Sequence, residues 1–356
     1  MEHGTVFLCR DIYLDDELDD VAKRLIADGF QVRRGEPVTP GRKRVLTKEE
    51  RAALLSDADV IVVSSRNLLS AEDMAAATRL RAVIAPTIGV DAIDLAAAER
   101  LGVIVGHGAT PENFLSMAEA TTMLIAALFY DLHGTERVLR QNLPRPRSMK
   151  ARMLRGSTIG LVGFGRIARG VHERLSGWET RLLVHDPYLT SQDMPQGTCL
   201  VDFEVLLRES DLVSLHVTLD AKTRGMIGEA QLRAMKPGSF IVNTARGGLI
   251  DEEALYRALK DGHLAGAALD TFDPEPLPAH SPLREPDNII LTPHMVGHTR
   301  DVMASVAPAL RENIRRVMGG KLPLYTKNAQ VASAWRQRLQ VLGSQYATQQ
   351  GGTPCW

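Results

Sequence analysis

In three segments of the sequence, an apolar run is followed by a polar residue that could bind a carboxylate or take part in proton transfer. Arg246, Glu275 and His294 each follow a run of apolar residues that is typical of a buried strand. An arginine can bind a carboxylate through two parallel hydrogen bonds, and a histidine paired with a glutamate can deliver and recover a proton near neutral pH. Because the carboxyl ends of the strands surround the ligand crevice in an open α/β sheet, we expect the three side chains to share one edge.

Each of these residues also has a structural interpretation. Arg246 could pair with Asp251 or Glu252 at the start of a helix, Glu275 could be a solvated turn acid, and His294 could be an ordinary loop histidine. The occurrence of all three in order, each after a predicted strand, favours the chemical interpretation. None of the other nine histidines is expected to be catalytic.

A glycine-rich segment, Gly163-x-Gly165-x-x-Ala168, follows another apolar run and opens a predicted helix. In such a context the first glycine permits a tight turn, the second lets the backbone approach a pyrophosphate, and the small third residue lets the helix pack on the sheet. The amides of Arg166 and Ile167 would then face the anion at the helix N-terminus. The segment therefore predicts a dinucleotide site.

Asp186 lies 18 residues beyond Ala168, at the end of the next predicted strand. A carboxylate there accepts hydrogen bonds from the ribose hydroxyls and repels a 2′-phosphate, so NAD is predicted in preference to NADP. The alternative is a surface acid that caps the turn at Pro187.

The apolar runs form two series, which predict an α/β protein with two Rossmann-like domains. The first series predicts a small flavodoxin-like domain with strands at 5–9, 59–63, 82–85 and 103–105. The second predicts a doubly wound, six-stranded dinucleotide-binding domain with strands at 158–162, 181–184, 212–215, 240–242, 265–269 and 289–291.

Helix signals set the expected domain boundaries. Ser116 and Glu119 have capping-box spacing and predict the start of a long linking helix that runs to about Asn142. A helix from Thr299 to about Met318 is expected to complete the first domain. We therefore expect a substrate domain of residues 1–116 and 299–324, with the NAD-binding domain, residues 117–298, inserted in it.

Residues 325–356 are expected to form a C-terminal amphipathic helix and tail. Trp335, Leu339, Leu342 and Tyr346 recur at helical spacing and predict one apolar stripe. The stripe would pack against this chain or a sister subunit, and a partner-binding helix is the alternative. The final eight residues, from Gln349, are expected to be disordered.

The composition argues against several classes of partner. The 356 residues carry a net charge of -1 without long runs of like charge, so neither nucleic acid nor a membrane is expected as a partner. The N-terminal residues lack the pattern of a signal peptide, and no apolar stretch is long enough to span a bilayer. Cys9, Cys199 and Cys355 have neither metal-ligand nor disulfide spacing, which favours a cytoplasmic protein without a metal.

The sequence resembles the NAD-dependent D-2-hydroxyacid dehydrogenase family, which includes glyoxylate and hydroxypyruvate reductases and phosphoglycerate dehydrogenase. The resemblance runs from Val60 to about Met318. It includes the segments 89–94, 116–120, 163–170, 243–253, 293–294 and 297–299.

The resemblance implies a role for each candidate residue. Arg246 would orient the substrate's carboxylate and carbonyl, His294 would be the acid–base group, and Glu275 would hold His294 while hydride moves between NAD and the substrate's C2. Further cofactor contacts would come from Thr218, Thr244, Ala245, Asp270 and Gly297, and amides near Ser65 and Gly89 would hold the substrate's carboxylate. Members are commonly homodimers that associate through the cofactor domain and its linking helix.

Some positions depart from the family pattern and leave the identity of the small 2-hydroxy or 2-oxo acid open. Thr218 stands where proline is frequent, and Ala92 replaces a frequent asparagine. Two other functions remain as alternatives: an NAD-sensing protein similar to transcriptional corepressors, and a formate or phosphite dehydrogenase.

Overall fold

The computed structural model describes residues 4–39 and 41–349, and the chain forms two compact units. One unit comprises residues up to 113 together with those from 299 onward, and the other comprises residues 114–298. Both are built on parallel sheets with helices on the two faces, so the predicted α/β class is confirmed. The predicted tail and the side chain of Tyr346 lie outside the described part of the chain.

The first unit contains a five-stranded parallel sheet in the order β2-β1-β3-β4-β5, which is the flavodoxin-like order. Its strands are β1 (Thr5–Leu8), β2 (Gln31–Arg34), β3 (Val60–Val62), β4 (Ala82–Ile84) and β5 (Ile104–Gly106). Its helices within the N-terminal part are α1 (Asp15–Ala27), α2 (Lys48–Leu55), α3 (Ala71–Ala76) and α4 (Leu95–Arg100). The central strands β1, β3 and β4 and the edge strand β5 are buried throughout, which explains their continuous apolar runs.

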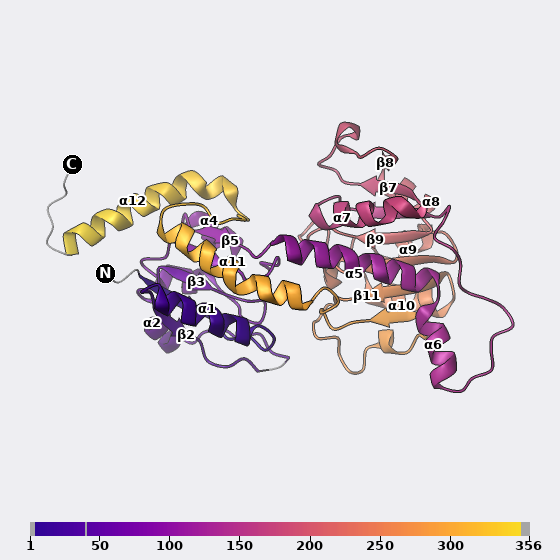
Figure 1. Ribbon diagram of the computed structural model, residues 1–356, viewed down its shortest axis with the longest axis horizontal. Coiled ribbons are helices and arrows are strands. Elements are labelled where there is room, and N and C mark those ends of the chain that lie inside the picture. The colour runs from indigo at the N-terminus through magenta and orange to yellow at the C-terminus, as the bar shows by residue number, and fades with distance from the viewer. Residues whose placement is uncertain (1–3, 40, 350–356) are drawn as a thin grey trace. The chain divides into compact units, whose positions relative to one another are not determined.

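The C-terminal helices α11 (Arg300–Met318) and α12 (Ala332–Gln349) both belong to this first unit. Helix α11 begins at Thr299, whose hydroxyl accepts a hydrogen bond from the amide of Val302, and it lies beside α1 on one face of the sheet (Figure 1). Helix α12 packs Trp335 and Leu339 of its apolar stripe against the core of its own unit. Trp335 is fully buried there, and its indole N–H donates to the carbonyl oxygen of Arg81 at 2.8 Å.

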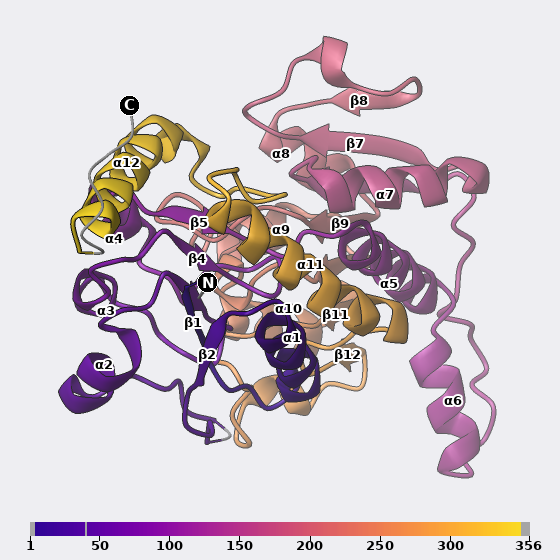
Figure 2. The same cartoon turned by 60° about the vertical axis from the view of Figure 1, so that its left-hand side comes forward.

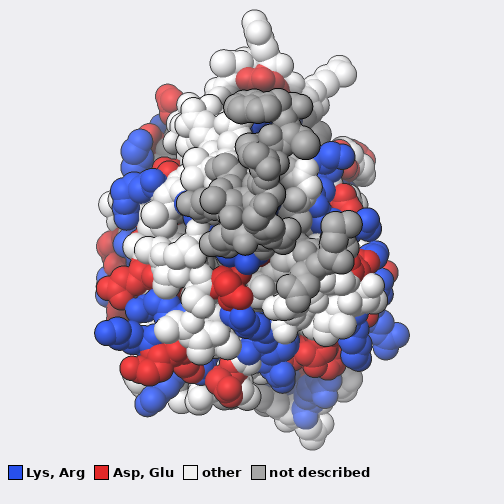
Figure 3. Space-filling view, turned by 90° about the vertical axis from the view of Figure 1, so that its left-hand side faces the viewer, with Lys and Arg blue, Asp and Glu red and all other residues white. Residues whose placement is uncertain are grey.

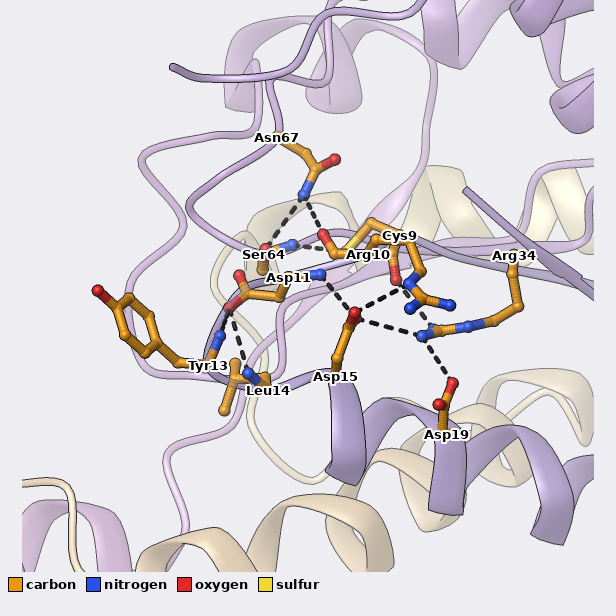
Figure 4. A network of polar contacts seen from close by, with 10 residues as sticks. All are labelled: Cys9, Arg10, Asp11, Tyr13, Leu14, Asp15, Asp19, Arg34, Ser64 and Asn67. Carbon is orange, nitrogen blue, oxygen red and sulfur yellow. Dashed lines mark hydrogen bonds and ion pairs between the residues drawn. The ribbon is translucent and has the colours of Figure 1, made fainter. Parts of the chain in front are cut away.

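Polar side chains fix the loops that follow β1 and β3, at the switch point of this sheet (Figure 4). The Asn67 amide donates to the carbonyl of Arg10 at 2.9 Å and to the Ser64 hydroxyl at 3.2 Å. The Asp15 carboxylate accepts from the Asp11 amide at 2.8 Å and from the Arg10 guanidinium at 2.9 Å. The two loops are therefore held to each other and to α1 by side chains.

The second unit contains a seven-stranded parallel sheet in the order β12-β11-β10-β9-β6-β7-β8. Its strands are β6 (Thr158–Val162), β7 (Arg181–His185), β8 (Thr198–Leu200), β9 (Leu212–Leu215), β10 (Ser239–Asn243), β11 (Leu264–Leu269) and β12 (Ile289–Leu291). Its helices are α5 (Pro111–Phe129, entering from the first unit), α6 (Leu132–Arg140), α7 (Arg166–Leu175), α8 (Phe203–Glu209), α9 (Glu229–Ala234) and α10 (Glu252–Lys260). The direction of chain progression reverses between β6 and β9, as in doubly wound dinucleotide folds.

Two separate apolar cores cover the faces of this sheet (Figure 2). Helices α5 and α7 pack on one face through residues such as Ile125 and Val171, while α8, α9 and α10 pack on the other through residues such as Leu206 and Leu255. The strands are thereby buried from both sides.

Two predictions about strands were incomplete. The sequence predicts four strands in the first sheet and six in the second, whereas β2 and β8 raise these numbers to five and seven. Both added strands lie at sheet edges, and their sequences, Gln31–Arg34 and Thr198–Leu200, lack a continuous apolar run because they are partly solvated.

The predicted limits of the long helix were wrong. Helix α5 begins at Pro111, five residues before Ser116, because the Thr110 hydroxyl accepts from an amide of the first turn and proline suits a first helical position. It ends at Phe129 rather than near Asn142, since Asp131 adopts a left-handed conformation at φ 46° and a separate helix α6 follows.

The surface carries charges of both signs. On the face shown in Figure 3, basic and acidic side chains are interspersed rather than gathered by sign, as the net charge of -1 suggests. Within residues 4–39 and 41–349, no single helix has both the length and the apolar character required to cross a bilayer, although the bent pair α5–α6 meets the criteria jointly.

The burial of Trp335 predicts that α12 stabilises the first unit. Replacing Trp335 with alanine should lower the free energy of unfolding by about 3–5 kcal/mol, because it leaves a cavity and an unpaired carbonyl at Arg81. Thermal and urea unfolding would measure this loss. The control is Val341→Ala on the same helix, where the side chain is 56% exposed and little change is expected. An equal effect of the two substitutions would contradict the assignment.

Candidate active site

The candidate residues of the second unit follow six strands that end at the same edge of one parallel sheet. Gly163 follows β6, Asp186 follows β7, Arg246 follows β10, and His294 follows β12. Thr218 and Asp270 follow β9 and β11 in the same way. The fold thus gathers side chains from 163 to 294 along the edge at which a doubly wound sheet binds ligands.

The glycine loop has the backbone geometry that a pyrophosphate site needs. Gly163 has φ +87°, and a Cβ atom there would lie 2.8 Å from a methyl group of Val217. Gly165 is the N-cap residue of α7, and a Cβ atom there would meet nothing within 4 Å. Because Gly165 offers no side-chain acceptor, the first amides of α7 face this open space and can bind an anion.

Asp186 connects the glycine loop to the end of β7. One carboxylate oxygen accepts from the Phe164 amide at 2.9 Å, and the other accepts from the Tyr188 amide at 3.0 Å. The carboxylate therefore fixes the loop between the two glycines, and each of its oxygens retains capacity for a further donor such as a hydroxyl.

The turn that carries Arg246 is held by the side chain of Asn243, the last residue of β10. Its amide nitrogen donates to the Arg246 carbonyl at 2.8 Å, and its amide oxygen accepts from the Ala245 amide at 3.0 Å. A Cβ atom on Gly247 would lie 1.9 Å from the carbonyl carbon of Phe272, so only glycine fits there. The segments after β10 and β11 are therefore in direct main-chain contact.

A buried carboxylate, Asp270, holds the loop that carries His294. Its Oδ1 accepts from the Thr292 hydroxyl at 2.7 Å, from the Met295 amide at 2.9 Å and from the Val296 amide at 3.2 Å. His294 itself has φ +58°, a left-handed conformation that is uncommon for a residue with a side chain. The hydrogen bonds of Asp270 offset the cost of this conformation, which is about 1–3 kcal/mol.

His294 and Glu275 form a close pair. The Nδ1 atom of His294 lies 2.9 Å from one carboxylate oxygen of Glu275 and 3.0 Å from the other. The histidine side chain is 37% exposed and the glutamate 30%, so the pair is open to solvent on one side. A proton on Nδ1 directed at two acceptor oxygens leaves Nε2 as the ring nitrogen available for chemistry.

The other predicted cofactor residues lie in the same unit with different contacts. The Thr244 hydroxyl is 3.0 Å from that of Thr121 on α5, and Gly297 accepts from the Ser116 hydroxyl at 2.8 Å through its carbonyl. Thr218 is exposed at the end of the β9 segment. Ala245 is half-buried beside Arg246.

Ser65 and Gly89 belong to the first unit. They follow β3 and β4, which are neighbours in its sheet, and the Ser65 side chain is exposed. The loop of Ser65 is the one held by Ser64 and Asn67 in Figure 4.

His216 lies near the glycine loop but differs from His294. Desolvation lowers the pKa of its imidazole to about 4, and its Nε2 lies 2.9 Å from the Ser214 hydroxyl. Because the ring is neutral at physiological pH and already bonded, His216 is a structural residue.

Sequence reasoning did not assign site roles to Asn243, Gly247 or Ser116. Asn243 and Gly247 flank Arg246 in an Asn-x-x-Arg-Gly pattern, which is a usable signal for a side-chain-braced turn. Ser116, predicted as a cap, lies inside α5 and bonds to Gly297 instead, and Glu119 pairs with Arg174.

A strand, a glycine loop, an uncapped helix and an acid after the next strand together define a dinucleotide-binding α/β protein, in which a histidine–glutamate contact lies among the loops after the later strands. A comparison with protein families matches residues 99–296 to the NAD-binding domain of D-isomer specific 2-hydroxyacid dehydrogenases.

Individual relatives agree with this match. A glyoxylate reductase of Thermofilum pendens is 35% identical over 292 residues, which are 80% of this chain and 86% of the relative. A D-3-phosphoglycerate dehydrogenase of Archaeoglobus fulgidus is 35% identical over 279 residues, which are 78% of this chain but 53% of the relative. The crystal structure of the TT0316 protein from Thermus thermophilus is 31% identical, with a TM-score of 0.77 over 90% of this chain and 99% of that one.

The chain therefore belongs to the family of D-isomer specific 2-hydroxyacid dehydrogenases, a family of NAD-dependent oxidoreductases. NAD is the cofactor of the matched domain. The chain spans about half the length of the phosphoglycerate dehydrogenases that it matches.

The geometry at the glycine loop predicts that one alanine substitution affects cofactor binding and another affects thermal stability. Gly165→Ala should leave the melting temperature of the cofactor-free protein unchanged, because its Cβ meets no protein atom, yet it should weaken NADH binding at least ~10-fold by occupying the pyrophosphate space. Gly163→Ala should lower the melting temperature, because it forces a side chain into positive φ against Val217. Thermal unfolding and NADH titration would measure both effects. Unchanged NADH affinity in Gly165→Ala would contradict this placement of the cofactor.

Proposed function

We propose that this protein interconverts a small 2-hydroxy acid and the corresponding 2-oxo acid with NAD(H) as the hydride carrier. The observation that carries the proposal is the contact of His294 Nδ1 with both carboxylate oxygens of Glu275, at the sheet edge that also carries Arg246 and the glycine loop. Membership of the dehydrogenase family supports the class of reaction.

His294 is the proposed acid–base group. The Glu275 carboxylate accepts a hydrogen bond from Nδ1–H, so the Nε2 atom donates a proton to the developing alkoxide during reduction and accepts one from the hydroxyl during oxidation. The two contacts of Nδ1 with the Glu275 carboxylate fix the orientation of the imidazole ring. Nε2 has no hydrogen-bond partner among the residues that the structure describes, which leaves it open to substrate.

Arg246 is the proposed clamp for the substrate's carboxylate and carbonyl oxygen. A guanidinium can bind a carboxylate through two parallel hydrogen bonds, which fixes the orientation of C2. The turn braced by Asn243 and the close packing of Gly247 hold the backbone of Arg246 in place. Amides near Ser65 and Gly89 remain proposed contacts for a substrate carboxylate.

The glycine loop and Asp186 are the proposed determinants of cofactor binding. The amides of Arg166 and Ile167 would hold the pyrophosphate, and the Asp186 carboxylate would accept the ribose hydroxyls and disfavour a 2′-phosphate. When bound, NAD supplies or accepts the hydride. Further proposed cofactor contacts are Thr218, Thr244, Ala245, Asp270 and Gly297, within the proposed NAD-binding domain of residues 117–298.

Asp270 therefore has two proposed functions. Its Oδ1 holds the backbone beyond His294, and its other oxygen is proposed to face the nicotinamide side of the cofactor.

We also infer a cytoplasmic location, because the reaction draws on NAD(H) and Cys9 and Cys199 are free thiols. No observation favours a corepressor-like protein or a formate or phosphite dehydrogenase over this proposal.

A panel of 2-oxo acids assayed with NADH and NADPH would test the proposal. We expect turnover with at least one small 2-oxo acid and a preference for NADH. His294→Ala should then reduce kcat by about 10²–10⁴-fold while NADH affinity is retained, because only the proton transfer is lost. The control is His280→Ala, an exposed histidine that follows Glu275 in the same loop. Retained turnover in His294→Ala, or no turnover with any 2-oxo acid, would refute the assignment.

We propose that the protein is a homodimer that associates through α5, α6 and the segment after them. These elements carry large apolar side chains that are exposed in the single chain, namely Met123, Tyr130, Leu132, Leu139, Leu143, Met149 and Met153. Exposed apolar surface of this extent is typical of an interface.

Light scattering at micromolar concentration is expected to give twice the chain mass of 39.0 kDa. Leu139→Glu should reduce the measured mass to that of a monomer, because Leu139 is 85% exposed in the single chain and a buried charge would disfavour association. Val341→Glu on α12 serves as the control, since its side chain is also exposed, at 56%. A monomeric wild-type protein would rule the proposal out.

A further inference from the structure

Glu275 lies on a short exposed segment, and its position depends on the contacts that hold the main chain of that segment. The segment lies between two buried residues, Phe272 and Leu277, and its residues from Asp273 to Pro276 are exposed. The described contacts of the Glu275 side chain are those with His294. The position of Glu275 therefore depends on how the main chain near Asp273 is held.

The main chain at Asp273 is held by Glu252, the first residue of α10. Glu252 Oε1 accepts a hydrogen bond from the Asp273 amide at 2.8 Å. Glu252 is half-buried, and desolvation raises the pKa of its carboxyl group while the bond from Asp273 opposes that rise. The contact thus joins the helix after Arg246 to the segment that carries Glu275.

The two acids that flank Glu252 have other roles. Asp251 is the N-cap of α10 and accepts from the Ala254 amide at 3.0 Å. Glu253 is exposed and lies 3.9 Å from Arg257, one helical turn away. Glu252 is therefore the one of these three adjacent acids that reaches the Glu275 segment.

A cavity lies beside this contact, next to Asp273. It has a volume of about 400 Å³, and its lining includes Gly248, Glu252, Asp273 and Ser281. The Asp273 side chain is paired with Arg224 at 2.7 Å, and both side chains are largely solvent-exposed, at 46% and 61%. Such an exposed ion pair is a weak restraint. The remaining restraints at this end of the segment are the main-chain bond to Glu252 and the close packing of Phe272 against Gly247.

We propose that Glu252 is a positioning residue for the Glu275–His294 pair: its carboxylate fixes the Asp273 amide and thereby sets the approach of Glu275 to His294. This inference rests on the proposed function of that pair. Loss of the bond would let the segment move into the neighbouring cavity, and displacement by about 1 Å can reduce the rate of a positioned proton transfer ~100-fold.

The test compares four variants: Glu252→Ala, Glu252→Asp, Glu252→Gln and Glu253→Ala. Alanine removes the acceptor, aspartate keeps the charge but shortens the reach, and glutamine keeps an acceptor oxygen at the same distance. Glu253→Ala removes a charge from the next position, where the side chain is 69% exposed. The measurements are kcat, KM and NADH affinity for the best 2-oxo acid, and the pH profile of kcat/KM for its reduction.

We expect Glu252→Ala and Glu252→Asp to lower kcat about 10- to 100-fold with unchanged NADH affinity. The pH profile of kcat/KM should change as it does in Glu275→Gln, because both kinds of variant lose the contact between Glu275 and His294. Glu252→Gln should restore most of the rate, and Glu253→Ala should resemble the wild type. Glu252→Asp keeps the test available should Glu252→Ala fail to fold.

A further variant, Glu275→Gln, distinguishes the proposed chemistry of the His294–Glu275 pair from the proposed positioning role of Glu252. If it leaves the rate and pH profile of the wild type unchanged, the proposed His294–Glu275 chemistry is wrong. If it shifts them while Glu252→Ala and Glu252→Asp do not, the positioning role of Glu252 is wrong and the chemistry stands. Loss of rate in Glu252→Gln equal to that in Glu252→Ala would also overturn the proposal, because the hydrogen bond would then not be the cause.

Discussion

All strands of a parallel sheet have their carboxyl ends at the same edge. The placement of the candidate site residues in the second unit depends on this constraint. Gly163, Asp186, Arg246, Asp270 and His294 are far apart in the sequence, yet each follows a different strand of one seven-stranded sheet. The apolar cores on its two faces hold the strand ends in fixed register. The separation between helix α7 and the His294–Glu275 pair is therefore set by the spacing of neighbouring strands, about 4.8 Å, rather than by the loops.

Beyond the strand ends, side chains replace the hydrogen bonds that the sheet no longer provides. The Asn243 side chain forms hydrogen bonds with a backbone carbonyl and a backbone amide of the turn at Arg246. The Asp270 carboxylate accepts hydrogen bonds from two amides and a hydroxyl in the loop of His294. Backbone groups without a sheet partner must find other partners when water is excluded, and these side chains supply them. The same contacts keep His294 in a left-handed conformation that directs its ring toward Glu275. A few hydrogen bonds from short side chains to the backbone thus hold the loops of the candidate site in place.

The sequence predicted the buried strands and the types of the candidate residues because both follow local rules. Continuous apolar runs indicate strands covered on two faces, and polar residues directly after them are easily found. Edge strands β2 and β8 were missed because partial exposure removes their apolar signal. The start of α5 was misplaced because two capping signals compete, and Ser116 is used for a contact with Gly297, 181 residues away. The contacts of Gly247 with Phe272 and of Glu252 with Asp273 join segments more than twenty residues apart, so no local pattern reports them.

The discontinuity of the first unit has a consequence for synthesis of the chain on the ribosome. Helix α11 supplies Val306, Leu310 and Ile314 to the core around β1, β3 and β4, but these residues are translated only after the whole of residues 114–298. At about 5–20 residues per second, the first sheet waits roughly ten to forty seconds for its last helices. During that interval the part of the nascent sheet beside α1 that α11 will cover stays exposed, while the second unit has all its own strands available. The order of folding is therefore expected to reverse the order of synthesis, with the middle of the chain reaching its final form before the beginning.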